Sequence, residues 1–211
     1  MEKKYELVFD IGANIGAFSE KILSFNENCK IILIEPNDDL KKTLEDKFIG
    51  KNVEILNFIV SEKSNEIIKF HISNADKIST ASVDWILNSR FSNNYEWNKV
   101  VKKLSINLED LIKKYGNPDL IKIDVEGYEY EVIKGLVSKQ KEICFEWAEE
   151  KYEDINKTCE YLEKIGYDQF GFIYGDEYLK KPNLYSSWKD CNIHNDINPF
   201  RKEKWGMIWV K

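Results

Sequence analysis

The sequence predicts an α/β protein built on a mostly parallel, doubly wound sheet. Short apolar segments alternate with amphipathic helical ones, several apolar segments are continuous enough for strands buried on both faces, and a glycine-rich turn follows the first of them. Strands are expected at 5–11, 30–35, 53–60, 66–72, 119–125, 142–147, 168–174 and 205–210.

Helices are expected between many of these strands, and on both faces of the sheet. The expected helices run from near Ile15 to Phe25 and over 38–48, 108–115, 128–137 and 154–165. No long helix separates 168–174 from 205–210, so the last strand should run antiparallel to its neighbours.

The length of 211 residues and the 43% hydrophobic content suit one domain over 1–211. Two irregular segments, about 73–103 and 175–204, should cover the carboxyl ends of the strands and recognise the substrate. The chain opens almost directly on its first strand, which favours one domain of a longer polypeptide.

Charge and composition exclude several classes. A net charge of −6 argues against general affinity for nucleic acid or anionic membrane, although a local basic patch stays possible. No apolar run approaches the roughly 20 residues of a membrane span, which predicts a soluble, cytoplasmic protein. The cysteines lack C-x-x-C spacing and are expected to be reduced, with Cys29 and Cys144 in the core. The sequence does not define the oligomeric state.

The first informative motif is Phe-Asp-Ile-Gly-Ala-Asn-Ile-Gly at 9–16. Gly12 and Gly16 should lie where the first strand turns into a helix. A dinucleotide enzyme has a glycine at the middle position of this turn, where the backbone approaches a pyrophosphate, but this chain has Asn14. Alone, the turn could be a tight strand-to-helix connection.

Two carboxylates favour a cationic adenosyl cofactor. Asp10 ends the first strand, where it would repel a diphosphate and attract the ammonium and sulfonium of S-adenosylmethionine. Glu35 ends the next strand about 20 residues after the glycine-rich turn, the separation at which an acidic residue binds a ribose diol.

The second informative motif is Leu-Ile-Lys-Ile-Asp-Val-Glu-Gly-Tyr-Glu at 120–129. Asp124 and Glu126 follow a buried strand, and they could share a metal ion or divide the roles of base and orienting group. Alternatively, Glu126 caps the next helix and Asp124 binds loop amides. Glu146 ends the following strand beside Trp147, and either reaches the acceptor or is a solvated strand end.

Taken in order, these motifs resemble the FkbM family of S-adenosylmethionine-dependent O-methyltransferases. The resemblance spans roughly 7–147, and the C-terminal third carries no matching motif. It rests on D-x-G-A-N-x-G at 10–16, E-P at 35–36, V-S at 60–61, S-T-A-S at 79–82, L-E-D-L at 108–111, K-I-D-V-E-G-Y-E at 122–129 and F-E at 145–146.

The resemblance implies a Rossmann-like class I methyltransferase fold with a seven-stranded sheet, acting on a hydroxyl of a sugar or of a polyketide-type natural product. It also allows fusion to other glycan-processing domains. The implied cofactor residues are Asp10, Gly12, Asn14 and Gly16 for the methionine part, Glu35 with flanking Pro36 and Asn37 for the ribose, and Val60 and Ser61 for the adenine. Asp124, Glu126 and Gly127 would form the floor between cofactor and acceptor, and Ser79, Thr80 and Ser82 could line the pocket.

Methyl transfer to a hydroxyl needs in-line positioning, aided by a base or a metal. Asp124 and Glu126 are the first candidates for the base and Glu146 is the third, with His71 and His194 as competitors. The carboxylates are compatible with a divalent metal, but no spacing demands one. A carbohydrate acceptor is preferred, because aromatic side chains in the irregular segments could stack on a sugar ring: Trp85, Tyr95, Trp97, Tyr185 and Trp188.

Three other functions remain open. The protein could methylate a hydroxyl of a non-sugar natural product. It could be an NAD-dependent oxidoreductase, which would need another pyrophosphate cradle in place of the missing glycine. It could also bind the cofactor without catalysis, as a regulatory or scaffolding module.

Overall fold

A computed structural model describes residues 5–175, 180–191 and 204–211. Within them, seven strands form the main sheet in the order β3-β2-β1-β7-β8-β10-β9. These strands are β1 (Leu7–Ile11), β2 (Lys30–Ile34), β3 (Val53–Leu56), β7 (Leu120–Ile123), β8 (Ile143–Ala148), β9 (Phe170–Tyr174) and β10 (Trp205–Val210).

The sheet is parallel except for its last strand in the sequence. β1 pairs in parallel with β2 and β7, and the β2–β3 and β7–β8 pairs are parallel too. β10 runs antiparallel to both β8 and β9. The predicted doubly wound sheet with an antiparallel closing strand is therefore confirmed. Its register places Asp10 directly beside Lys122.

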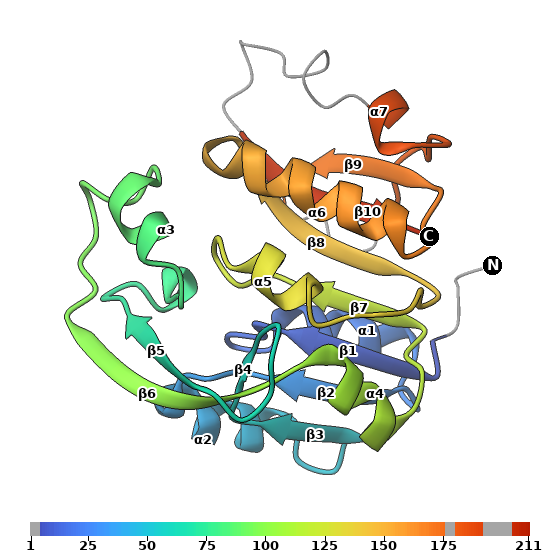
Figure 1. Cartoon of the computed structure of the whole chain (residues 1–211). Coiled ribbons are helices and arrows are strands. Elements are labelled where there is room, and N and C mark those ends of the chain that lie inside the picture. Colours follow the sequence, from blue (N-terminus) through green and yellow to red (C-terminus); the bar gives the residue numbers. More distant parts are fainter. Residues whose placement is uncertain (1–4, 176–179, 192–203) are drawn as a thin grey trace.

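Helices cover both faces of this sheet (Figure 1). On one face, α1 (Ala17–Phe25) and α2 (Asp38–Lys47) pack through apolar residues against β1 and β2. On the other face lie α4 (Leu108–Tyr115), α5 (Glu129–Ile133) and α6 (Tyr152–Lys164), with the short α7 (Trp188–Cys191) joining the same apolar cluster. The helix expected at 128–137 is shorter, because its regular part ends before the close approach of Gly135 to the Ser61 carbonyl.

A second, three-stranded sheet has the order β4-β6-β5 and consists of β4 (Ile59–Val60), β5 (Ile67–Ile72) and β6 (Lys99–Ile106). The strand expected at 53–60 is thus two strands in different sheets. The segment expected to be irregular at 73–103 contains the 3-10 turn η1 (Asp76–Ile78), the helix α3 (Val83–Asn88) and the first half of β6.

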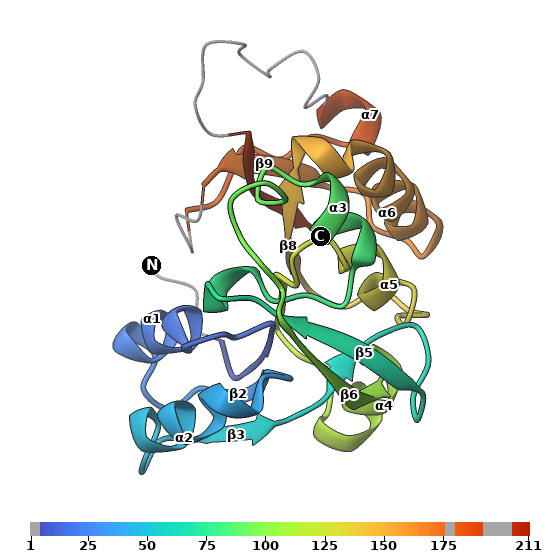
Figure 2. The ribbon, with the colours of Figure 1, turned by 90° about the vertical axis from the view of Figure 1, so that its left-hand side faces the viewer.

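This second sheet and α3 lie beyond the carboxyl ends of the parallel strands. Figure 1 shows β5, the first part of β6 and α3 on the left, and Figure 2 shows these three elements in front of the main sheet. The fold therefore places a cover over the edge where an open α/β sheet binds ligands. Of the second expected covering segment, 175–204, residues 176–179 and 192–203 lie outside the described residues.

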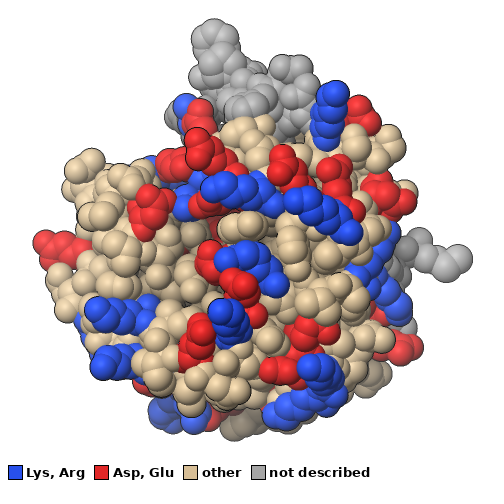
Figure 3. Space-filling model, in the orientation of Figure 1, with Lys and Arg blue, Asp and Glu red and all other residues tan. Residues whose placement is uncertain are grey.

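All four cysteines are buried and free, as expected. Lys and Arg are interspersed with Asp and Glu on the face shown in Figure 3. Among the described helices, none has the length and apolar character needed to cross a membrane.

Candidate functional site

A cavity of about 610 Å³ opens at the carboxyl ends of β1, β2, β7 and β8. This volume lies within the roughly 300–1,000 Å³ of small-molecule and cofactor sites. Residues from 11–18 other than Gly16 form one end together with the Glu35–Pro36 pair, and residues from 75–95 form the other end. The floor includes Lys122, Asp124, Val125 and Glu126. The cavity thus extends from the predicted cofactor residues to the cover.

The glycine-rich turn has a backbone that only small or permissive residues adopt. Gly12 has φ +71°, and a Cβ at this position would lie 1.8 Å from the carbonyl oxygen of Asp124. Asn14 also has positive φ, 49°, in a region that asparagine tolerates better than most residues. The turn therefore brings its backbone against the 124–127 turn, and Gly12 and Asn14 both line the cavity.

Glu35 is buried at the wall between the turn and α2. Its Oε2 accepts a hydrogen bond from the Asn14 N–H at 2.8 Å, and its Oε1 accepts one from the Asn37 N–H at 2.8 Å. Burial raises the pKa of this carboxyl to about 7, although the hydrogen bonds from the Asn37 and Asn14 N–H groups act to lower it. Because Glu35 takes the Asn14 N–H, this amide is not available to a pyrophosphate, which argues against the oxidoreductase alternative.

Asp10 occupies a different place from the one expected of a group that touches the ligand. It is 0% exposed and does not line the cavity. Its Oδ2 accepts a hydrogen bond from the Ser19 hydroxyl at 2.6 Å, and its Oδ1 lies 3.2 Å from the Lys122 Nζ. Protein groups thus satisfy the charge of Asp10, and any effect on a ligand passes through Lys122.

Lys122 is a site residue that sequence reasoning missed. Its side chain is 3% exposed, and its Nζ donates to the Gly12 carbonyl at 2.8 Å and lies 3.5 Å from Asp124 Oδ2. It therefore connects the glycine-rich turn to the floor of the cavity. The available signal was a lysine inside an otherwise apolar buried strand, because such a charge needs a partner.

The remaining predicted cofactor residues divide into two groups. Pro36 and Val60 line the cavity. Gly16, Asn37 and Ser61 lie behind its wall: Gly16 precedes α1 and packs on Phe48, the Asn37 side chain caps α2, and the Ser61 hydroxyl lies 3.2 Å from the Tyr128 hydroxyl.

The three predicted catalytic carboxylates converge on the cavity floor. Asp124 and Glu126 come from the turn after β7, and Glu146 comes from β8. One carboxylate oxygen from each lies within 4.8 Å of the others. Burial raises the pKa of Glu126 and Glu146 well above the ordinary value for glutamate, and the neighbouring carboxylates raise both further.

A separate set of contacts holds the turn that carries Asp124 and Glu126. Glu129 Oε1 accepts hydrogen bonds from the Val125 N–H at 3.0 Å and the Gly127 N–H at 3.3 Å. The Thr80 hydroxyl donates to the Glu126 carbonyl at 2.7 Å. The alternative in which Asp124 binds loop amides and Glu126 caps the next helix is not found: Glu129 binds the two amides, and among the described residues no side chain caps α5.

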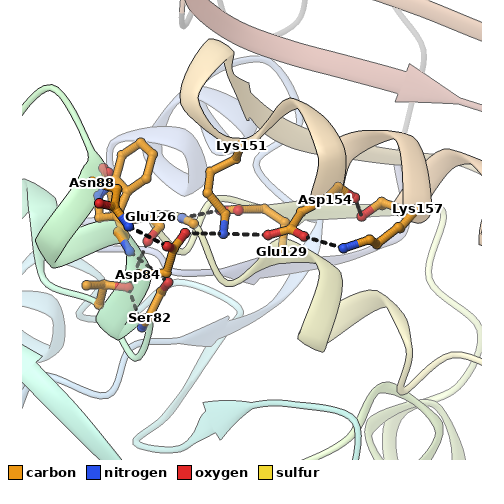
Figure 4. A network of polar contacts seen from close by, with 12 residues as sticks. Ser82, Asp84, Asn88, Glu126, Glu129, Lys151, Asp154 and Lys157 are labelled. Atoms are coloured by element: carbon orange, nitrogen blue, oxygen red, sulfur yellow. Dashed lines mark hydrogen bonds and ion pairs between the residues drawn. The ribbon is translucent and has the colours of Figure 1, made fainter.

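The cover is fastened to the rest of the protein by charged contacts. Lys151, in the 3-10 turn η2 (Glu149–Lys151), pairs with Asp84 of α3 at 2.8 Å and also with Asp154 of α6. Figure 4 shows Lys151 between these two aspartates. Beside this network, Gly127 packs so closely on Trp85 that an added Cβ would lie 2.9 Å from the indole ring. Helix α3 is thereby fixed above the floor.

The aromatic residues at the cavity differ from most of those predicted. Of the five, Tyr95 lines it, together with Phe91 and Trp205, which the sequence did not single out. The other four have structural roles: Trp85 and Trp188 are buried, the Trp97 indole donates to the Ile78 carbonyl, and Tyr185 bridges to Phe170 in the backbone.

Two cations also line the acceptor end of the cavity, Lys77 and Arg90. The Arg90 guanidinium lies over the Phe91 ring and 3.7 Å from Glu150 Oε2. From 79–82, Ser79 and Ala81 line the cavity, whereas Thr80 and Ser82 lie behind it.

Of the two histidines, His71 is the one that lies among the described residues. His71 lies on β5 and is not among the lining residues, and burial lowers its pKa. His194 lies outside the described residues. The carboxylates are therefore better placed than His71 to act as a base.

Comparison with known proteins places this site in a family context. The sequence model of the Methyltransferase FkbM domain matches residues 10–169. A search of the curated proteins found no match. Among solved structures, fibrillarin from Aeropyrum pernix with natively bound S-adenosyl-L-methionine has 8% sequence identity and a TM-score of 0.53. The match covers 99% of this chain and 67% of the fibrillarin chain. Precorrin-6y C5,15-methyltransferase from Geobacter metallireducens has 14% identity and a TM-score of 0.48, covering 99% and 80%. The likeness to fibrillarin shows the fold, which is the Rossmann-like class I methyltransferase fold.

Proposed function

The chain belongs to the FkbM methyltransferase family, and from this premise we propose that it methylates a hydroxyl oxygen of a sugar or glycan. The methyl donor is S-adenosylmethionine. One observation carries the proposal: a single cavity joins the glycine-rich turn and Glu35 to three clustered carboxylates and an aromatic cover. A donor site and an acceptor site are thus continuous, as direct transfer requires.

At the donor end, Glu35 would accept hydrogen bonds from the ribose diol, and the backbone of 11–14 would hold the amino-acid part. Val60 would contact the adenine. The bound donor supplies an electrophilic methyl group on a sulfonium. Lys122 and Asp10 support this end indirectly, because Lys122 holds the Gly12 carbonyl in position.

At the floor, the carboxylates orient the acceptor hydroxyl and take its proton. A carboxylate with a raised pKa is a stronger base than an ordinary one, and burial raises the pKa of Glu126 and Glu146. Asp124 lies 3.5 Å from the Lys122 ammonium and forms an ion pair with it. Glu126 and Glu146 are therefore the preferred candidates for the base, and Asp124 for the orienting group.

A sugar acceptor is supported by the kinds of side chain at the other end. Phe91, Tyr95 and Trp205 provide aromatic surface for the apolar side of a pyranose, and the carboxylates accept hydrogen bonds from its hydroxyls. The proposal includes a cytoplasmic location, a single domain over 1–211 and the option of fusion to glycan-processing domains.

A methyl-transfer assay tests the function. The protein is incubated with isotopically labelled S-adenosylmethionine and a panel of sugars, glycosides and hydroxylated polyketides, and the mass and linkage of the products are determined. Methylated sugar, lost in Glu126→Gln, supports the proposal. Methylation of the polyketides alone would contradict the acceptor class, and thermal stabilisation by NAD but not by S-adenosylhomocysteine would contradict the whole assignment.

A further inference from the structure

The carboxylate cluster of Asp124, Glu126 and Glu146 contains more negative charge than its described neighbours compensate. Lys122 approaches Asp124 at 3.5 Å, but it lies closer to Asp10, at 3.2 Å. One ammonium is therefore shared between two carboxylates. Among the described residues, neither Glu126 nor Glu146 has a lysine or arginine within ion-pair distance.

Arg90 contributes from the rim of the cavity only. Its charge acts to lower the pKa of Glu126 and Glu146. However, it pairs with Glu150 at 3.7 Å and its side chain is 28% exposed. Arg90 therefore offsets part of the negative charge of the cluster, while its own ion pair is with Glu150.

One glutamate of the cluster, Glu126, is also short of hydrogen bonds. Glu126 Oε2 is buried and makes no hydrogen bond of normal geometry to a described residue, although the nearby Trp85 indole N–H acts to lower the pKa of Glu126. Glu146 is only 8% exposed and lines the cavity. A buried carboxylate oxygen without a hydrogen-bond donor is destabilising, so this arrangement is expected where a ligand supplies the missing contact.

We propose that Asp124, Glu126 and Glu146 form a binding site for one divalent cation that prefers oxygen ligands, such as Mg²⁺, Mn²⁺ or Ca²⁺. Carboxylate ligands select this class of ion over zinc or copper. Two oxygens that bind one Ca²⁺ at 2.3–2.6 Å can lie at most about 5 Å apart, so the separations of up to 4.8 Å allow a shared ion. A smaller Mg²⁺ would draw the carboxylates closer together.

The role of this cation in catalysis rests on the proposed function. Three carboxylates leave coordination positions open toward the cavity, and an acceptor could fill them with two adjacent oxygens. The cation would orient the hydroxyl that is methylated and reduce the cost of its developing negative charge, and the proton would pass to the oxygen of Glu126 or Glu146 that does not bind the ion. The site thus favours acceptors with a vicinal diol, which is common in sugars, over those with a single isolated hydroxyl.

The test is a Mn²⁺ titration of the metal-free protein followed by electron paramagnetic resonance, in the presence and absence of S-adenosylhomocysteine. We expect one Mn²⁺ per chain, displaced by Mg²⁺ or Ca²⁺ and retained when S-adenosylhomocysteine saturates its own site. Glu146→Gln and Glu126→Gln should each weaken Mn²⁺ binding by about tenfold or more, because each removes a charged ligand. Glu131→Gln is the matched control, since Glu131 pairs with Lys134 away from the cavity.

Thermal melting separates metal binding from misfolding. The two glutamine variants should melt at or above the wild-type temperature without metal, because each relieves like-charge repulsion, and should lose the rise that Mn²⁺ causes in the wild type. Absence of Mn²⁺ binding, equal binding by all variants, or displacement of Mn²⁺ by S-adenosylhomocysteine would overturn the proposal. If S-adenosylhomocysteine binds and methyl transfer proceeds in EDTA, only the metal site is refuted; if it does not bind at all, the function is refuted.

Discussion

Lys122 is expected to be the single residue whose charge matters most to both stability and cofactor binding. Its ammonium lies between Asp10 and Asp124 and donates to the Gly12 carbonyl, with only 3% of the side chain exposed. Lys122→Met keeps much of the volume and removes the charge. Asp10 would then be a fully buried carboxylate whose remaining described contact is the Ser19 hydroxyl.

The size of the effect follows mainly from two of the contacts that are lost, the ion pair with Asp10 and the hydrogen bond to the Gly12 carbonyl. Removing one partner of a buried ion pair costs about 3–5 kcal/mol, because the other charge is left uncompensated. The lost hydrogen bond to the Gly12 carbonyl adds about 1 kcal/mol. The double variant Asp10→Asn, Lys122→Met has no orphaned charge at position 10, so its deficit should fall to about 1–2 kcal/mol.

Urea unfolding followed by far-UV circular dichroism measures these differences, and isothermal titration with S-adenosylhomocysteine measures the cofactor affinity. Lys122→Met should unfold at lower urea and bind the cofactor more weakly, and the double variant should recover most of the stability. A Lys122→Met protein within about 0.5 kcal/mol of wild type, or a double variant less stable than the single one, would refute the reasoning.

Three further predictions concern the rest of the cavity. Gly12→Ala should abolish binding of S-adenosylhomocysteine. Gly50→Ala, with nearly the same positive φ and open space around it, should cost only about 1–2 kcal/mol of strain and keep binding. Equal behaviour of the two variants would contradict the close approach of Gly12 to the Asp124 carbonyl oxygen. Cofactor affinity should rise about tenfold from pH 6 to pH 8, because the pKa of Glu35 is about 7 and only the ionised carboxylate accepts both hydrogen bonds of the diol. The cofactor affinity of Glu35→Gln should not change over this pH range. If it rises as in the wild type, a group other than Glu35 causes the pH dependence. Tyr95→Ala should raise the acceptor KM about two- to tenfold without changing the donor KM, and Tyr185→Ala, equally exposed on another part of the surface, should change neither.

The sequence was most informative where strands are buried on both faces. β1, β2, β7 and β8 were predicted because their continuous apolar runs bury every central residue, and the side chains at their carboxyl ends meet at one edge of the sheet. This topology brings Asp124, Glu126 and Glu146 together from separate segments. The sequence predicted that each follows or ends a buried strand, whereas the adjacency of β7 and β8 that brings Glu146 to the other two is seen only in the structure.

The cover was harder to predict, because its elements are short and half exposed. β6 contains three lysines, and most of its side chains are exposed or half-buried. It lies between β4 and β5 in the small sheet. Helix α3 has six residues and exposes Val83 and Leu87, so it lacks a recognisable apolar face. The strand expected at 53–60 breaks near Asn57, whose amide donates to the Glu35 carbonyl.

The positions of individual side chains at the site depend on contacts with residues far away in the sequence. Asp10 was expected at the ligand, but the β1–β7 register places it beside Lys122, which neutralises it. Trp205 was predicted only as part of the closing strand, yet its position at the start of β10 brings it to the cavity. Such pairings arise between segments about a hundred residues or more apart, and local patterns do not encode them.

The most direct test of the donor site is a crystal structure with bound S-adenosylhomocysteine. We expect the ribose hydroxyls within hydrogen-bond distance of the Glu35 carboxylate, the homocysteine part along the 11–14 backbone, and the sulfur facing the carboxylate floor. A ligand outside this cavity, or a ribose with no contact to Glu35, would contradict the account.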